Sequence, residues 1–320
     1  MSKIEILQTG ALMPEPDANL EKNFIIHRLD KATDKHALVA EVGPRIQGIV
    51  SAVGKNPVTA DIMRQCPQLK IVSGFGVGYD NIDTGYAAEN GIIVTNTPDV
   101  LNEEVADTAL ALLLATLRLI PQADRFVREG KWLKGGFPLS PTLRDRKAGI
   151  VGLGRIGKAI AKRLEAFGVS VAYHGRRKQD DISYPYYGTI KELAAVVDTL
   201  IIIIPGGKET YHAVNADVLK ALGPDGVLIN VARGTVVDEQ ALITALKNKT
   251  ILAAGLDVFE KEPQVPQELI DLDNTVLLPH IGSASVHTRN AMGNLVVKNI
   301  EAFFSGKAPL TPVPETPWSK

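Results

Sequence analysis

Short apolar runs alternate with longer segments of helical periodicity from one end of the chain to the other. An apolar run bounded by turn residues fits a strand buried on both faces, and the helical segments fit crossovers between parallel strands. The alternation therefore predicts an α/β protein with parallel sheets. In the first hundred residues the expected strands are 4–7, 24–27, 48–53, 70–73 and 92–95.

The pattern changes at Asn102, which can cap a helix whose first turn carries Glu103 and Glu104. This helix is apolar on nearly every side, and Pro121 marks its expected limit. A helix that is apolar all round is buried, so we expect it to run along a junction between two domains. The stretch 135–141, which is rich in Gly and Pro, is expected to be a loop.

A second α/β series follows this loop. Its expected strands are 148–151, 170–173, 199–204, 227–231, 252–256 and 275–278, with helices at 158–167 and after the capping-box pair Thr189 and Glu192. A last helical pattern at 285–304 could return the chain to the first domain, and the proline-rich tail after it is expected to pack loosely. We therefore expect a cofactor domain at 101–285 and a smaller domain formed by 1–100 with 286–320.

A glycine-rich turn separates the first strand of the second series from its helix, and it matches the pattern G-x-G-x-x-G. In this context Gly152 permits a tight turn, and Gly154 lets the backbone approach a pyrophosphate. Gly157 allows the helix to pack closely on the strand. The expected dinucleotide contacts at this helix N-terminus are Gly152, Leu153, Gly154, Arg155, Ile156 and Gly157.

The turn after the next strand indicates which dinucleotide is bound. NAD-specific folds place a carboxylate about 20 residues past the glycines, where it binds the ribose 2′-hydroxyl. Here Gly175 stands near that position, and Arg176 and Arg177 follow it. Guanidinium groups pair with phosphate, so we predict NADP as the cofactor, with NADPH preferred over NADH. The alternative interpretation is an exposed basic turn.

A second glycine cluster, formed by Gly74, Gly76 and Gly78, does not match the dinucleotide pattern, because Tyr79 stands where the third glycine belongs. We expect a loop here rather than the start of a helix. The backbone N–H groups of so glycine-rich a loop suit a substrate carboxylate.

Three strand ends of the second series carry side chains suited to reducing a 2-oxo acid. Arg233 follows one strand, Glu262 the next and His280 the last, and the carboxyl ends of parallel strands meet at one crevice. Arg233 can bind the substrate carboxylate and carbonyl. His280 is the natural general acid, because imidazole titrates near neutrality. Glu262, hydrogen-bonded to the other ring nitrogen, would keep the histidine protonated and oriented.

Composition narrows the class of partner. Lys and Arg total 35 and Asp and Glu total 36, so neither nucleic acid nor an anionic membrane is expected as a partner. No apolar run approaches the ~20 residues of a membrane span, and the N-terminus leads directly into a strand-like pattern. The single cysteine, Cys66, excludes an intramolecular disulfide and a thiolate metal cluster. We expect a cytoplasmic protein without a metal.

Taken together, the motifs resemble the signatures of the D-isomer-specific 2-hydroxyacid dehydrogenases. The matching segments are 151–157, 230–234, 255–258, 279–282 and, in the first domain, 76–83. The resemblance covers nearly the whole chain and is greatest to the NADPH-dependent glyoxylate/hydroxypyruvate reductases, with plant-type hydroxyphenylpyruvate reductases close. It implies a Rossmann-type, doubly wound cofactor domain and a smaller flavodoxin-like α/β substrate domain. The implied reaction reduces small 2-oxo acids to D-2-hydroxy acids.

The resemblance also implies roles for residues of the first domain. The amides of Val77 and Gly78 match the loop that receives the substrate carboxylate, and Val53 with Gly54 forms a similar loop. The oxo acid is expected to bind these loops and Arg233.

Further cofactor contacts follow from the same resemblance. Thr108 matches a contact to a cofactor phosphate, Asp257 matches the residue that binds the nicotinamide carboxamide, and Val231 lies in the segment of Arg233. A homodimer formed through the cofactor domain is implied as well. Some family members carry a tryptophan in the arm before the glycine turn, where this chain has Gly-Gly-Phe-Pro-Leu at 135–139.

Other readings of the same motifs are less consistent with the sequence. Formate dehydrogenases carry a glutamine at the position of Glu262, and long phosphoglycerate dehydrogenases carry an additional regulatory domain. A non-enzymatic nicotinamide-cofactor sensor would not need the three strand-end residues. Within the family, a hydroxyphenylpyruvate reductase or another 2-oxo acid reductase stays open as an alternative.

Overall fold

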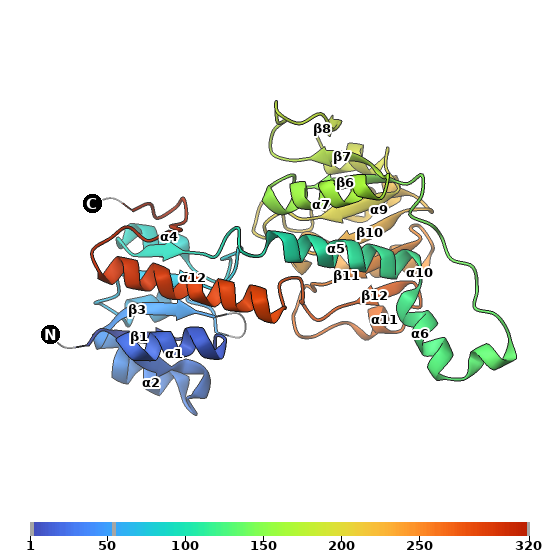
Figure 1. The fold of residues 1–320 in the computed structure, drawn as a ribbon. Helices are drawn as coiled ribbons and strands as arrows, with labels where there is room; N and C mark the ends of the chain where they lie inside the picture. Colours follow the sequence, from blue (N-terminus) through green and yellow to red (C-terminus); the bar gives the residue numbers. More distant parts are fainter. Residues whose placement is uncertain (1–2, 53–55, 319–320) are drawn as a thin grey trace. The chain divides into compact units, whose positions relative to one another are not determined.

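The computed structural model describes residues 3–52 and 56–318, which fold into two compact units (Figure 1). Unit 1 consists of Met1–Leu101 and Ser285–Lys320, and unit 2 consists of Asn102–Ala284. Each unit contains one parallel sheet, so the prediction of an α/β protein with parallel sheets is confirmed.

The sheet of unit 1 has five strands in the order β2-β1-β3-β4-β5, and each neighbouring pair is parallel. This is the flavodoxin-like strand order. The strands are β1 (Glu5–Gln8), β2 (Ile25–Arg28), β3 (Ile46–Ser51), β4 (Ile71–Gly74) and β5 (Ile93–Thr95).

Helices cover both faces of this sheet, because alternate residues of a strand point to opposite sides. Ile6 packs in an apolar cluster with Leu20 of α1 and Val296 of α12, whereas its neighbour Leu7 packs in a second cluster with Val39 of α2. The helices of unit 1 are α1 (Pro14–Asn23), α2 (Lys35–Val42), α3 (Ala60–Arg64), α4 (Thr84–Glu89) and α12 (Val286–Phe304), with 3-10 turns η1 (Leu29–Lys31) and η2 (Gly43–Arg45).

The chain does return to the first unit through α12, but the expectation of a loosely packed tail is wrong. The N–H of Val313 donates to the carbonyl of Val94 (2.9 Å), and the hydroxyl of Thr316 accepts from the N–H of Val94 (2.8 Å). Val313 is 1% exposed. The reason is the position of β5 at the sheet edge, where its unpaired backbone groups bind the tail and prolines are tolerated.

The sheet of unit 2 has seven parallel strands in the order β12-β11-β10-β9-β6-β7-β8. This is the doubly wound Rossmann arrangement, with its switch point between β6 and β9, and ligands bind such sheets beyond the carboxyl ends of the strands. The strands are β6 (Lys147–Val151), β7 (Ser170–His174), β8 (Tyr186–Tyr187), β9 (Thr199–Ile202), β10 (Val227–Asn230), β11 (Ala253–Leu256) and β12 (Thr275–Leu277).

Two helical layers enclose this sheet. A Cβ at Gly255 would point at Leu112 of α5, whereas the adjacent Ala254 and Leu256 lie in the apolar cluster with α8, α9 and α10, so the two layers cover opposite faces. The helices of unit 2 are α5 (Asn102–Leu117), α6 (Ile120–Arg128), α7 (Arg155–Ala166), α8 (Ile190–Ala194), α9 (Ala216–Leu222), α10 (Glu239–Lys247) and α11 (Gln267–Ile270), with 3-10 turns η3 (Lys131–Lys134) and η4 (Gly234–Val236).

Helix boundaries in unit 2 differ from expectation at two places. The long apolar helix ends at Leu117, Leu119 adopts a left-handed backbone (φ 52), and Pro121 lies in the first turn of α6. Proline is tolerated at a helix start, so it opens the next helix rather than limiting the previous one. Helix α7 begins at Arg155 rather than 158, because Gly154 is its N-cap.

Candidate functional site

The glycine turn of unit 2 joins β6 to α7, and each glycine has a different structural reason. Gly152 has φ +104, and a Cβ there would lie 2.6 Å from the carbonyl oxygen of Ile203. A Cβ on Gly157 would overlap the carbonyl oxygen of Gly152, so only glycine lets α7 approach the strand this closely. Gly154 meets no atom within 4 Å, so its surface is open. An open helix N-terminus beside bare backbone is suited to a pyrophosphate.

The turn after β7 lies next to this glycine turn. The side-chain amide of Gln179 donates to the carbonyl of Leu153 (2.8 Å), which ties the two turns together. The Tyr186 hydroxyl donates to the carbonyl of Gly175 (3.2 Å) and fixes the start of the second turn. Arg176 and Arg177 then lie exposed. Arg176 and Arg177 therefore belong to an exposed turn that is hydrogen-bonded to the candidate pyrophosphate turn.

Asn230 shapes the turn that carries Arg233. Its buried side chain accepts from the N–H of Ala232 (3.0 Å) and donates to the carbonyl of Arg233 (3.0 Å). Nη1 of Arg233 also donates to the carbonyl of Ala232 (2.8 Å). Val231, which was predicted as a cofactor contact, is buried at the start of this turn. Arg233 thus lies at the carboxyl end of β10, in a turn that the Asn230 side chain stabilises.

The Arg233 turn and the turn after β11 touch through their backbones. A Cβ on Gly234 would overlap the backbone carbonyl group of Phe259, so the two chains pack together without an intervening side chain. This close approach brings the segment of Arg233 next to the segment of Glu262, as the shared sheet edge predicts.

Glu262 and His280 form a hydrogen-bonded pair. Nδ1 of His280 lies 2.8 Å from Oε2 of Glu262, and Oε1 of Glu262 accepts from the N–H of Phe259 (3.1 Å). Because Nδ1 donates its proton to the carboxylate, Nε2 is the ring nitrogen that can serve a substrate. His280 itself has a left-handed backbone (φ 55), which is uncommon outside glycine and concentrates at functional sites.

Electrostatics keep the Glu262 carboxylate charged. Burial raises its pKa, but the hydrogen bond and charge of His280, the Phe259 amide and the charge of Arg233 together outweigh burial and hold the pKa below its usual range. The influence of Arg233 on this carboxylate places all three predicted side chains in one electrostatic environment. An ionised carboxylate on one ring nitrogen is the partner that orients a proton-donating histidine.

The buried Asp257 carboxylate fixes the turn that follows His280 through hydrogen bonds to its backbone, a role that the sequence did not reveal. It is 1% exposed, and its two carboxylate oxygens accept from the N–H groups of Ile281 (2.7 Å) and Gly282 (2.8 Å). Burial raises the pKa of Asp257, and these two amides oppose the increase. The hydroxyl of Thr108 reaches the carbonyl of Gly282 (3.4 Å). Both residues predicted as cofactor contacts therefore meet the turn after β12.

In unit 1, the Gly76–Gly78 segment is a loop after β4, and no helix begins before α4, as expected. The carbonyl of Val77 accepts from the side-chain amide of Asn96 (2.8 Å). The N–H of Gly76 donates to the hydroxyl of Thr97 (2.9 Å), so Asn96 and Thr97 hold the start of the loop as far as the Val77 carbonyl. The other two predicted substrate residues, Val53 and Gly54, lie outside the described residues.

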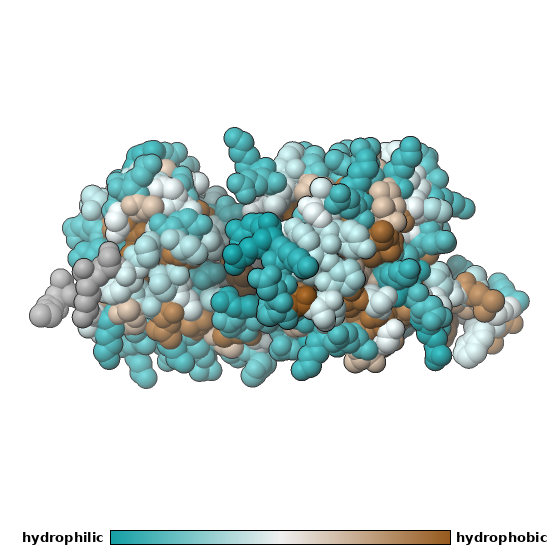
Figure 2. All heavy atoms as spheres, turned by 90° about the horizontal axis from the view of Figure 1, so that it is seen from above, coloured by the Kyte–Doolittle hydropathy of each residue, from teal (hydrophilic) through white to brown (hydrophobic). Residues whose placement is uncertain are grey.

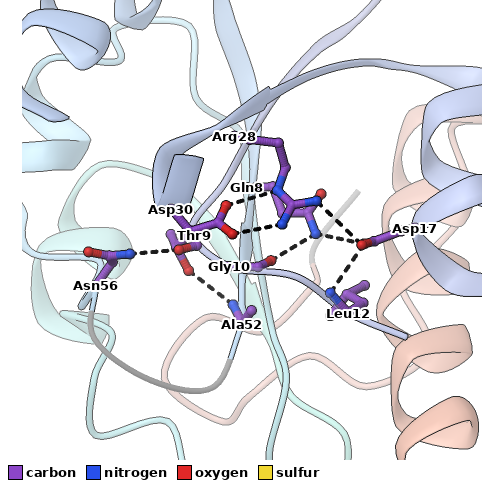
Figure 3. A network of polar contacts seen from close by, with 9 residues as sticks. All are labelled: Gln8, Thr9, Gly10, Leu12, Asp17, Arg28, Asp30, Ala52 and Asn56. Carbon is purple, nitrogen blue, oxygen red and sulfur yellow. Dashed lines mark hydrogen bonds and ion pairs between the residues drawn. The ribbon is translucent and has the colours of Figure 1, made fainter. Parts of the chain in front are cut away.

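A polar network fixes the carboxyl ends of β1, β2 and β3 in the same unit (Figure 3). Asp17 accepts from the Gln8 side chain (2.7 Å) and pairs with Arg28 (3.4 Å). Thr9 accepts from the Ala52 N–H at its hydroxyl (3.0 Å), and its carbonyl accepts from the side chain of Asn56 (2.7 Å). The network includes Gln8, Thr9, Gly10, Leu12, Asp17, Arg28, Asp30, Ala52 and Asn56.

Two features are absent from the described part of the chain. Within residues 3–52 and 56–318, no helix has the length and hydropathy of a membrane span. Over the same residues, no three or more His, Cys, Asp or Glu side chains are grouped so that they could hold a metal ion.

The fold and these motifs define a class. The sequence profile of the D-isomer specific 2-hydroxyacid dehydrogenase NAD binding domain matches residues 110–282, more than half of the chain. The chain belongs to the D-isomer specific 2-hydroxyacid dehydrogenases.

Individual relatives extend the match to both units. Glyoxylate/hydroxypyruvate reductase A of Arabidopsis thaliana is 47% identical over 98% of this chain and 100% of its own length. Hydroxyphenylpyruvate reductase of Plectranthus scutellarioides is 44% identical over the same shares. A solved NADPH-dependent glyoxylate/hydroxypyruvate reductase from Sinorhizobium meliloti, in complex with NADP and malonate, is 52% identical with a TM-score of 0.93, covering 100% of this chain and 99% of that one.

Proposed function

We propose that this protein reduces glyoxylate and hydroxypyruvate to the D-2-hydroxy acids with NADPH. The observation that carries the proposal is the His280–Glu262 hydrogen bond, beside Arg233 and on the unit that holds the dinucleotide turn. Relatives with this printed activity align with nearly the whole chain and support it. The division into a cofactor domain (unit 2) and a substrate domain (unit 1) is part of the same proposal.

The proposed mechanism assigns one task to each side chain. Bound NADPH supplies the hydride that the carbonyl carbon receives. Arg233 binds the substrate carboxylate and stabilises the negative charge that develops on the carbonyl oxygen. His280 donates a proton from Nε2 to that oxygen, and Glu262 holds the ring through Nδ1. The amides of Val77 and Gly78, with Val53 and Gly54, are proposed to receive the substrate carboxylate.

The test of the proposed function is NADPH oxidation by purified protein, followed at 340 nm with a panel of 2-oxo acids. Turnover of glyoxylate and hydroxypyruvate is expected to exceed that of larger acids. Hydroxyphenylpyruvate reductase is the second candidate function, supported by the 44% identical relative. A panel in which only hydroxyphenylpyruvate is turned over selects that alternative, and a panel without turnover contradicts both.

The cofactor is proposed to be NADP, bound through its 2′-phosphate by Arg176 and Arg177. We expect kcat/KM for NADPH to exceed that for NADH. Replacing both arginines by alanine is expected to raise the KM for NADPH by about 100-fold or more, because each charge-assisted hydrogen bond contributes a net of about 1.5–3 kcal/mol. The KM for NADH should change little, since NADH has no 2′-phosphate.

The outcome that contradicts this assignment is an equal loss with both cofactors. Lys247→Ala serves as the control, because Lys247 lies in the last turn of α10, outside the proposed cofactor contacts. It is expected to leave both KM values unchanged.

The assembly is proposed to be a homodimer in the cytoplasm, formed through unit 2. Its arm after α6 carries apolar side chains that no core covers, and Figure 2 shows apolar surface on it at the right-hand end of the view. Trp132 is 68%, Leu133 94% and Leu139 100% exposed. Apolar side chains gathered on one projecting segment are typical of a protein interface. The buried, free thiol of Cys66 is compatible with the reducing cytoplasm.

Replacing Leu133 and Leu139 together by glutamate is expected to convert the dimer to a monomer, because the interface would then bury two unpaired carboxylates. Sedimentation-velocity centrifugation measures the change. Leu310→Glu, at a half-exposed leucine of unit 1, is the control and is expected to leave the dimer intact. A wild-type chain that sediments as a monomer contradicts the proposal.

A further inference from the structure

The turn that carries Glu262 is held by a second cluster of polar side chains, which the proposed mechanism does not use. Oε2 of Glu239, the first residue of α10, accepts a hydrogen bond from the backbone N–H of Glu260 (3.3 Å). The Glu260 carboxylate accepts from the hydroxyl of Tyr211 (3.3 Å). Nε2 of His212 lies 3.4 Å from the same carboxylate oxygen. The start of α10 and the loop after β9 thus both contact the turn of Glu260.

The backbone around His212 is arranged to bring its ring to this cluster. His212 has a left-handed conformation (φ 51), and its N–H donates to the carbonyl of Thr235 (2.9 Å) in the Arg233 turn. The Tyr211 and His212 rings are stacked, with centroids 3.9 Å apart. A non-glycine residue keeps such a backbone only where its surroundings impose it. The loop after β9 is therefore fixed to the turns after both β10 and β11.

Charge is concentrated on one side of this cluster. The pKa of Glu239 is raised above its usual value. Burial, which is the largest effect, and the charge of Glu260 raise it, whereas the Glu260 amide and the charge of Lys261 lower it. The Asp238 carboxylate lies 3.9 Å from Nδ1 of His212. The carboxylates of Asp238 and Glu260 therefore lie on the two ring nitrogens of one imidazole. Nε2 of His212 is buried and makes no hydrogen bond. It lies at ion-pair distance from the Glu260 carboxylate but does not hydrogen-bond to it.

These side chains do not form a metal site, because no three His, Cys, Asp or Glu side chains among the described residues are placed to hold a metal ion. The link to the catalytic pair is one peptide unit long. The N–H of Phe259 donates to Glu262, and the next N–H along the chain, that of Glu260, donates to Glu239. Whatever moves the Glu260 amide also moves the donor that fixes the Glu262 carboxylate.

We propose that Glu239 is a positioning residue for the general acid: it holds the Glu260 amide, which fixes the turn of Glu262 and, through that carboxylate, the ring of His280. The inference rests on the proposed function for its kinetic consequence. Its structural part is the hydrogen bond from the Glu260 amide to Glu239, which we call the clamp, and this part does not depend on the proposed function. The Tyr211 hydroxyl completes the clamp through its hydrogen bond to the Glu260 carboxylate, and His212 lies at ion-pair distance from the same oxygen.

The test compares Glu239→Ala with Glu239→Gln. Alanine removes the acceptor, and kcat for hydroxypyruvate reduction is expected to fall about tenfold, because small displacements of catalytic groups have effects of this size or larger. The pH–kcat profile should shift as well, since a displaced Glu262 loses the His280 hydrogen bond that helps to hold its pKa below the usual range. Glutamine keeps a carbonyl acceptor and is expected to restore both readouts, and NADPH affinity should be unchanged in each variant.

Glu192→Ala is the matched control. The Glu192 carboxylate also accepts a backbone N–H, that of Thr189 (3.0 Å), but in the capping box of α8. Its loss should lower the melting temperature without moving the pH profile. A Glu239→Ala protein with the wild-type profile, or a shift of equal size in Glu192→Ala, overturns the positioning role.

Amide hydrogen exchange separates this proposal from the proposed function, because it needs no activity. Glu239→Ala should accelerate exchange in the peptide that spans 259–262, whereas Glu192→Ala should not. If the wild-type protein reduces no 2-oxo acid, the proposed function fails while faster exchange still supports the clamp. Unchanged exchange in Glu239→Ala overturns the clamp whatever the activity.

Discussion

Replacing His280 by alanine is expected to lower kcat for 2-oxo acid reduction by roughly 10²- to 10⁴-fold, the contribution typical of a positioned general acid. The reason is geometric. Nδ1 of His280 is committed to Glu262, so Nε2 is the atom left to protonate the carbonyl oxygen. NADPH affinity should be unchanged, because His280 itself is not among the candidate dinucleotide contacts, most of which lie on the turns after β6 and β7. Steady-state kinetics and fluorescence titration with NADPH measure the two quantities separately.

His36→Ala is the control for this experiment. His36 is an exposed histidine of α2 in unit 1, so its loss changes the histidine content without touching the candidate site. It is expected to leave kcat at the wild-type value. A His280→Ala protein that retains wild-type turnover would falsify the assignment of the general acid.

Much of the fold followed from the sequence because parallel strands are buried on both faces and appear as continuous apolar runs. Those runs located the strands of both sheets except β8, whose two residues, Tyr186 and Tyr187, are too few to form a pattern. The tail was misjudged for a different reason. Its prolines indicate irregular structure, but they do not show that Val313 pairs with an edge strand far away in the sequence.

The candidate site was predictable to the extent that strand ends meet at one sheet edge. That rule brought Glu262 and His280 together, and the structure places them 2.8 Å apart. The supporting residues Asn230 and Asp257 were not predicted as supports, because their partners are backbone amides and carbonyls that no side-chain pattern identifies. One signal was available: each polar residue ends or directly follows a buried strand, where a polar side chain needs hydrogen-bond partners.

Replacing Gly234 by alanine is expected to destabilise unit 2 by about 3 kcal/mol or more and to abolish most activity, because overpacking of rigid backbone has no low-cost relief. The new Cβ would overlap the Phe259 carbonyl group, and backbone cannot rotate away as a flexible side chain can. The two turns that carry Arg233 and Glu262 must then separate. The melting temperature should fall by roughly 6–12 °C, as expected for a domain of this size.

The experiment pairs calorimetry with kinetics at a temperature where the variant stays folded. Gly85→Ala is the matched control, because a Cβ there meets only Asp83 at 3.5 Å and alanine suits the helix α4. It should leave stability equal or slightly higher and activity unchanged. If folded Gly234→Ala keeps wild-type kcat, the close packing of the two turns does not set the catalytic geometry. A reduced kcat in the folded variant shows that Arg233 and Glu262 act from one packed unit, which neither strand end could form alone.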